Sequence, residues 1–181
     1  MRDTRRGFTL LETLFALVIL TTGFFSAFAL LRKSISVTQT SINQLIAANL
    51  AQEGIEIVRN MRDSIYVEGD DWGVVVDNGH LNQHGCLVNP INCEVDIDIN
   101  NKKPLDEDDN AYLKVDSNDQ YQYSSGVDSK FRRWVNLTQG EGFCTEIATA
   151  DDCIMINVDI LWSERGNDFT FSVEDYIYNF Y

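Results

Sequence analysis

The sequence predicts an α+β protein in which one long N-terminal helix packs on an antiparallel β-sheet. The first 62 residues contain no proline, and an apolar run over residues 8–31 passes into a one-sided apolar pattern without a helix breaker. Short alternating segments separated by turn residues fill most of the remaining chain. We therefore expect the helix to cover residues 8 to 62 and the strands to follow it.

Charge is distributed unevenly along the 181 residues, whose formal net charge is -14. Residues 1–33 are net positive, whereas the rest of the chain is strongly acidic. An acidic surface repels phosphate backbones, so no nucleic-acid partner is expected. The sequence contains no P-loop, G-x-S-x-G, H-E-x-x-H or G-x-G-x-x-G pattern. We therefore predict a protein without catalytic residues or a cofactor.

The apolar run over residues 8–31 contains a single ionisable side chain, Glu12. As a helix it would be about 36 Å long, enough to cross a hydrocarbon core of about 30 Å. A carboxylate at the centre of such a span costs about 2.5–3.5 kcal/mol and less towards an end. Glu12 therefore needs an explanation, of which a position among the lipid headgroups is the simplest.

A motif at the start of the run offers another explanation. Residues 5–12 read Arg-Arg-Gly-Phe-Thr-Leu-Leu-Glu, so a basic leader ends at Gly7 and Glu12 is the fifth residue counted from Phe8. This pattern resembles the class III signal of type IV prepilins and pseudopilins, closely over residues 2–33 and loosely to residue 62. The resemblance implies cleavage between Gly7 and Phe8 by a prepilin peptidase, which also N-methylates Phe8.

The same resemblance implies a pilin-like fold and a structural function. The protein would be a subunit, possibly a minor one, of a type IV pilus or a related secretion or competence pseudopilus. It would be held first in the cytoplasmic membrane with its head outside, and then at the cell surface. Its expected partners are the prepilin peptidase, the inner membrane and other pilin subunits, which it would contact through the N-terminal helix.

The chemistry of the motif suggests an assembly role for Glu12. Cleavage would leave a cationic amine on Phe8 at the edge of an apolar helix. Such a cation needs a partner when it is buried in a bundle, and Glu12 is the only anion in the apolar run over residues 8–31. Pairing within one chain or with a neighbouring subunit is possible, and the second arrangement would fix axial register.

A rival interpretation is an ordinary secretory or membrane-anchored surface domain that binds an external ligand. Ala27-Phe28-Ala29 has the A-x-A form of a signal-peptidase site. Against it, Glu12 interrupts the apolar region and apolar residues continue through Leu31. The N-terminal residue of the mature protein separates the alternatives.

Four parts of the chain are expected: a leader (1–7), a hydrophobic half-helix (8–33), an amphipathic half-helix (34–62) and an acidic β-rich head (63–181). The amphipathic stripe consists of Ile35, Ile42, Ile46, Leu50, Ile57 and Met61. A break near residues 34–41 is an alternative, because serine and threonine there have modest helix propensity.

In the head, strands are expected at 74–76, 95–99, 112–115, 121–123, 131–137, 154–162 and 169–173. Between them we expect a hairpin turn at 116–119, a turn at 163–168 and a loop at 102–110.

The four cysteines fall into two local pairs. Local pairing, Cys86 with Cys93 and Cys144 with Cys153, is the simplest of three possible connectivities. Two disulfides would place the head in an oxidising, extracytoplasmic space.

Metal ligation is the alternative to these disulfides. His80 and His84 precede Cys86 and Cys93, but glycine steps in this segment argue against a zinc-binding helix. Residues 96–107 imitate a calcium loop, yet Asn101 replaces the required glycine. The acidic run 106–109 is best explained as a solvated loop. We therefore predict no metal site.

Overall fold

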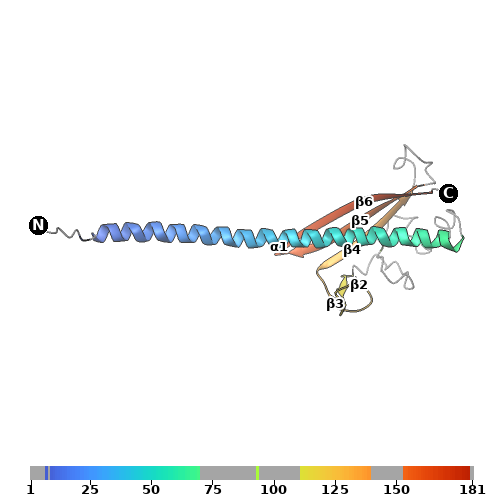
Figure 1. Ribbon diagram of the computed structural model, residues 1–181, viewed down its shortest axis with the longest axis horizontal. Coiled ribbons are helices and arrows are strands. Elements are labelled where there is room, and N and C mark those ends of the chain that lie inside the picture. Colours follow the sequence, from blue (N-terminus) through green and yellow to red (C-terminus); the bar gives the residue numbers. More distant parts are fainter. Residues whose placement is uncertain (1–6, 8, 70–92, 94–110, 140–152, 180–181) are drawn as a thin grey trace, which may run out of the picture. The chain divides into compact units, whose positions relative to one another are not determined.

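The computed structural model describes residues 7, 9–69, 93, 111–139 and 153–179 (Figure 1). The chain divides into two compact units, Met1–Asn43 and Gln44–Tyr181. A single long helix and six strands make up the described secondary structure, which confirms the predicted α+β class.

Helix α1 extends over Leu10–Glu68 without interruption. The predicted alternative, a break near residues 34–41, is wrong. There the hydroxyls of Thr38 and Thr40 donate to the carbonyls of Ser34 and Ser36 at 3.0 and 3.2 Å, so they are satisfied within the helix. The helix also ends six residues later than residue 62. Gly69, with φ 92°, is the first residue that adopts the left-handed conformation typical of a helix end.

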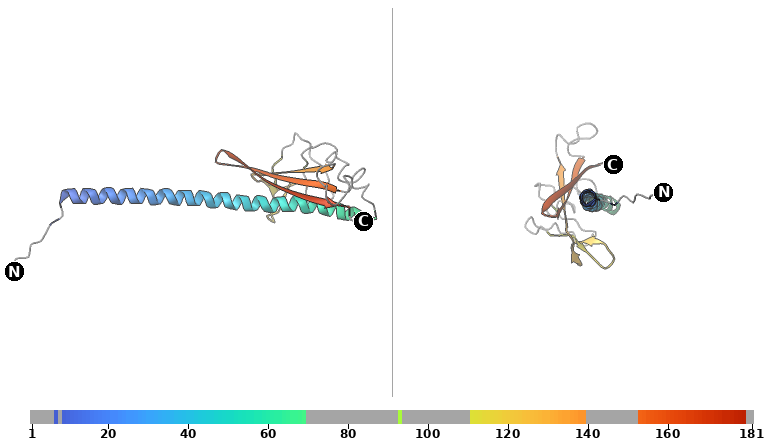
Figure 2. Two further views of the ribbon diagram at one scale, coloured as in Figure 1. Left: turned by 90° about the horizontal axis from the view of Figure 1, so that it is seen from above. Right: turned by 90° about the vertical axis from the view of Figure 1, so that its left-hand side faces the viewer.

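The larger sheet consists of β4 (Phe131–Gln139), β5 (Cys153–Glu164) and β6 (Asn167–Tyr178). The strands are antiparallel in the order β4-β5-β6, with Val135 opposite Val158 and Val158 opposite Val173. All three strands were predicted, and each is longer than expected. Figure 2 shows the sheet beside the C-terminal part of α1, which belongs to the same unit.

Strands β5 and β6 are joined by a turn of only two residues. Arg165 and Gly166 have φ of 54° and 79°, and Glu164 pairs with Asn167. Two consecutive left-handed residues form the hairpin turn whose twist matches that of the flanking strands. The predicted turn over residues 163–168 is therefore too wide, because Ser163 and Asp168 already pair within the ladder.

A small second sheet consists of β1 (Lys114–Val115), β2 (Tyr121–Gln122) and β3 (Val127–Asp128), in the order β2-β1-β3. The predicted hairpin around residues 116–119 is confirmed by the antiparallel β1–β2 pair. Strand β3 was not predicted. The segments 74–76, 95–99 and 102–110 lie outside the described residues.

The core of the head lies between the C-terminal part of α1 and one face of the larger sheet. Every second residue of the middle of β5 is fully buried, including Ile154, Ile156, Val158 and Ile160. The helix contributes Ala47, Leu50, Ala51, Gly54, Ile55, Ile57, Val58 and Met61, all of them buried. The predicted stripe is thus right for Leu50, Ile57 and Met61. It is wrong for Ile35 and Ile42, which are 64% and 53% exposed.

Small side chains on α1 permit a close approach to the sheet at Gly54. A Cβ on Gly54 would lie 3.1 Å from Val158 Cγ1 and 3.2 Å from Arg133 Cδ. Arg133 on β4 is fully buried at this contact. Its Nη1 lies 3.3 Å from Glu53 Oε1 and donates to the Leu50 carbonyl at 3.4 Å. A charged side chain is therefore enclosed between helix and sheet with an anion beside it.

We predict that Gly54→Leu destabilises the head by about 1–3 kcal/mol, because a large side chain overpacks this contact. Thermal unfolding followed by circular dichroism of the detergent-solubilised protein measures the effect. Gly23→Leu is the matched control, since a Cβ on Gly23 meets nothing within 4 Å. Equal melting temperatures for the two variants would contradict the packing explanation.

A second prediction concerns the β1–β2 turn. The Asp116 carboxylate accepts hydrogen bonds from the backbone N–H groups of Asn118 (2.8 Å) and Gln120 (2.9 Å). The bonds from Gln120 and Asn118 lower the pKa of Asp116 below 3.8. Because the folded-state pKa is depressed, the bonds stabilise the turn above pH 3.8 and are lost as pH falls through the lowered pKa.

Amide chemical shifts measured by NMR between about pH 6 and 2 test this prediction. We expect the Asn118 and Gln120 amides to shift together, with one midpoint below 3.8. In the control variant Asp116→Asn, this step should be absent from both amides. Two separate midpoints, or one above 3.8, would be incompatible with a shared carboxylate.

Candidate processing and assembly segment

The N-terminal end of α1 is built around Thr9, immediately before the first helical residue. The Glu12 backbone N–H donates to the Thr9 carbonyl at 3.1 Å and to Thr9 Oγ1 at 3.3 Å. The Thr13 N–H also donates to the Thr9 carbonyl, at 3.2 Å. Thr9 is therefore the N-cap of the helix, and its hydroxyl is a second acceptor for a backbone N–H of the first turn.

This arrangement reveals a function of Glu12 that the sequence analysis missed. Thr9-Leu10-Leu11-Glu12 has the spacing of a capping box, with Thr9 at the N-cap and Glu12 at the third helical position. A carboxylate in the first turn is also favoured by the positive end of the helix dipole. Glu12 thus occupies a position in which a carboxylate favours the start of α1 independently of any partner. Phe8, whose amine is the predicted partner, lies outside the described residues.

The remaining polar side chains of the apolar segment are satisfied inside the helix. Hydroxyls in this segment donate to backbone carbonyls of the preceding turn at 2.8–3.0 Å; they belong to Thr13, Thr21, Thr22 and Ser26. Hydrogen bonds of this kind allow threonine and serine to lie in an apolar environment. Within residues 9–31, Glu12 is therefore the only side chain whose charge calls for a partner beyond its own helix.

Large apolar side chains cover every side of α1 in this segment. All of the following are at least half exposed: Leu10, Leu11, Leu14, Phe15, Leu17, Val18, Ile19, Leu20, Phe24, Phe25, Phe28, Leu30 and Leu31. A helix that is hydrophobic all round is stable only in lipid or among other helices. By length and composition, α1 is able to cross a membrane.

The other predicted site residues are in the head. Cys93 and Cys153 are buried and both are disulfide-bonded. Cys93 also pairs with Val135 through two backbone hydrogen bonds, of 2.9 and 2.8 Å, at the edge of β4. Cys86 and Cys144 lie outside the described residues, so the pairing Cys86–Cys93 and Cys144–Cys153 stays a prediction.

The candidate metal ligands lie in undescribed parts of the chain. His80, His84 and the acidic residues of 96–101 and 106–109 are among the residues whose structure is not described. In the described ranges, no three His, Cys, Asp or Glu side chains are grouped as metal ligands would be. Cys93 is held in a disulfide and is therefore not a thiolate ligand.

Comparison with known proteins identifies the signal. Residues 2–28 match the family model of the prokaryotic N-terminal methylation motif. No curated protein and no solved structure matches the chain. The match covers the basic leader, the Gly7–Phe8 junction, Glu12 and most of the apolar segment. The chain thus has a type IV prepilin-like signal, and its α+β architecture is consistent with a pilin-like fold.

Proposed function

We propose that this protein is a structural subunit of a type IV pilus or a related pseudopilus, cleaved between Gly7 and Phe8 and methylated on the new amine. One observation carries the proposal: behind a prepilin-type signal, the apolar segment of α1 exposes large hydrophobic side chains on all sides and contains a single charge. This surface requires two environments in succession, lipid before assembly and neighbouring helices afterwards. The head would lie outside the cytoplasmic membrane.

Glu12 would favour packing among neighbouring helices over the lipid environment. In lipid, the carboxylate near the helix end raises the free energy of membrane insertion by up to about 2.5–3.5 kcal/mol. In a bundle, the Phe8 amine of a neighbouring subunit would supply a counter-ion at a defined height along the helix. The charge pair therefore favours one axial register over the alternatives that apolar contacts alone would allow.

Processing is tested with Gly7→Arg. A Cβ on Gly7 meets nothing within 4 Å, so the substitution leaves the fold of this protein undisturbed. We expect processing to stop, because a peptidase site at the entrance of a helix has no room for a bulky charged side chain. Electrophoretic size measures this, and Gly7→Ala is the size control. Gly7→Arg protein that still runs at the mature size would argue against the prepilin interpretation.

Assembly is tested with Glu12→Gln. We expect normal or easier membrane insertion, because a charge is removed from an apolar helix. Incorporation into filaments should fall, since an amine left buried without its counter-ion costs about 3–5 kcal/mol if fully desolvated. At 1.36 kcal/mol per tenfold change, this corresponds to a loss of at least about 100-fold. Co-assembly of tagged variant with wild-type protein measures it, with membrane levels determined in parallel.

Thr9→Val separates this pairing from the capping function. It removes the hydroxyl acceptor of the capping box, which is worth about 0.5–2 kcal/mol, and leaves the Glu12 charge in place. The pairing account predicts near-normal incorporation of Thr9→Val. Equal defects in the two variants would show that Glu12 acts through the helix cap. Normal incorporation of Glu12→Gln would remove Glu12 from assembly altogether.

A further inference from the structure

Strand β6 forms an open edge of the larger sheet. In the order β4-β5-β6, one side of β6 pairs with β5 from Asn167 to Tyr178, in a single register without a bulge. Figure 1 shows β6 as the outermost strand of this sheet. The opposite edge is different, because Val135 on β4 exchanges two backbone hydrogen bonds with Cys93. In the described part of the chain, no strand pairs with the outer side of β6.

The two-residue turn determines which backbone groups of β6 face outward. Glu164 and Asn167 close the turn, and they therefore form a hydrogen-bonded pair. Hydrogen-bonded and non-hydrogen-bonded pairs alternate along an antiparallel ladder, so the backbone N–H and C=O groups of Thr170, Ser172 and Glu174 point away from β5. Among the described residues, these groups have no hydrogen-bond partner. They offer a row of donors and acceptors to an added strand.

The side chains on the two faces of this edge differ in chemistry, because successive residues of a strand point to opposite faces. Phe169, Phe171 and Val173 are on the helix side, where they pack against the core but remain partly exposed. Asp168 and Glu174 are on the other face and are exposed. An added strand would cover the remaining apolar surface on one face and meet two carboxylates on the other.

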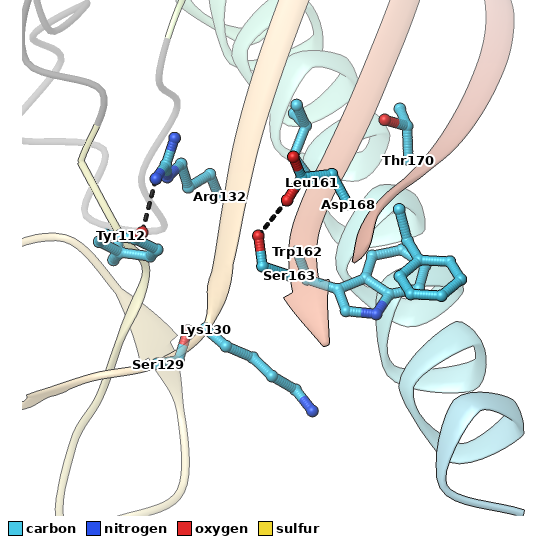
Figure 3. Close-up of a pocket in the computed structure, with 10 residues that line it drawn as sticks. Tyr112, Ser129, Lys130, Arg132, Leu161, Trp162, Ser163, Asp168 and Thr170 are labelled. Carbon is cyan, nitrogen blue, oxygen red and sulfur yellow. Dashed lines mark hydrogen bonds between the residues drawn. The ribbon is translucent and has the colours of Figure 1, made fainter. Parts of the chain in front are cut away.

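The charge of this edge is acidic. From the start of β6 to the C-terminus, the sequence has three acidic residues and no lysine or arginine. Asp175 is compensated on the helix side, where its carboxylate lies 2.5 Å from Arg59 Nη2. The Asp168 carboxylate accepts a hydrogen bond from the Ser163 hydroxyl, which leaves its charge in place (Figure 3). Asp168 and Glu174 therefore present two negative charges to an incoming strand.

We propose that the outer edge of β6 binds an extended, basic segment of another protein by strand addition. The segment would pair antiparallel with β6, as the neighbouring strands of this sheet do, and backbone hydrogen bonds would supply the affinity. Apolar side chains at alternate positions would contact Phe169, Phe171 and Val173. Lysine or arginine between them would face Asp168 and Glu174. Strand addition concerns the head alone and does not depend on the methylation motif.

A second copy of this chain fits the edge less well. A second β6 would bring its own carboxylates to the junction and has no basic residue to face Asp168 and Glu174. Like charges on neighbouring strands are destabilising, whereas opposite charges stabilise the pair. The formal net charge of -14 also attracts a basic partner at longer range. Charge therefore favours a basic segment over self-association.

The blocked heptapeptide Lys-Val-Thr-Val-Thr-Val-Lys tests the proposal on the full-length protein in micelles of an uncharged detergent. Its valines match the three apolar positions of the edge, and its lysines match the two acidic ones. We expect a Kd below about 1 mM, and binding at least about tenfold tighter than that of Glu-Val-Thr-Val-Thr-Val-Glu. Titrations followed by NMR amide shifts give both constants. No binding at about 1 mM, or equal binding of the acidic peptide, would overturn the proposal.

Amide hydrogen exchange tests the backbone pairing. In the free protein, the amides of Thr170, Ser172 and Glu174 should exchange quickly, and those of Phe171 and Val173 slowly. Saturating peptide should slow the first three by about tenfold or more. Unchanged exchange in the presence of bound peptide would contradict strand addition. Slow exchange of the outward amides without peptide, increasing with protein concentration, would assign the edge to a second copy and would also contradict the proposal.

N-methylated peptides test the same pairing from the side of the ligand. In the proposed register the threonine N–H groups donate to β6 and the valine N–H groups point away. Methylation of both threonine nitrogens should weaken binding by about tenfold or more, whereas methylation of the central valine nitrogen should change it by less than about threefold. Equal losses for the two peptides would be incompatible with this register.

A charge swap locates the binding. Glu174→Lys should weaken the lysine peptide and strengthen the glutamate peptide, each by about tenfold. Asp128→Lys is the matched control, because Asp128 is exposed on β3 and the change in net charge is the same. Unchanged melting temperatures verify folding. Equal effects of the two variants would indicate general attraction to an acidic protein, and no effect of Glu174→Lys would place the peptide elsewhere. Either result contradicts the edge of β6 as the site.

Discussion

The close contact between α1 and the larger sheet at Gly54 is the constraint on which the head depends. Val158 occupies the space that a side chain at position 54 would need. Because the helix approaches so closely, Arg133 is sealed between the two layers, where its guanidinium lies beside the Glu53 carboxylate and donates one hydrogen bond to the Leu50 carbonyl. The contact therefore fixes the rotation and the axial position of this part of α1 against β4 and β5.

The same helix has a different relationship to the rest of the chain in its N-terminal unit. From Gln44 onwards, small and apolar residues of α1 are covered by strands. In residues 10–31, apolar side chains remain exposed on all sides, and the serine and threonine hydroxyls are satisfied by their own backbone. One continuous helix thus combines a segment stabilised within the chain with a segment that requires an external apolar environment. This division is the physical basis of the proposed function, in which a subunit is held in a membrane and then assembled from it.

Much of this architecture was predictable because it follows from periodicity. The long helix and strands β4, β5 and β6 follow from breaker-free and alternating patterns. The contact at Gly54 was missed, because a search for large apolar residues passes over Ala47, Ala51 and Gly54. Arg133 was missed because a charged residue in an alternating strand is normally assigned to the solvent face. The spacing of Thr9 and Glu12 is that of a capping box and can be read from the sequence. It was missed because Glu12 was interpreted only as a charge within an apolar run. Cysteine pairing remains open because spacing alone permits three connectivities.

The central claim is that α1 begins the mature protein, with a modified amine close to the capped first turn. The most direct test is mass spectrometry of the N-terminal peptide of the mature protein purified from cells. The account predicts a chain that starts at Phe8 and carries one methyl group on its amine. A mature chain that starts at Leu30, or one that retains Met1, would contradict it and favour a conventionally secreted or anchored surface domain.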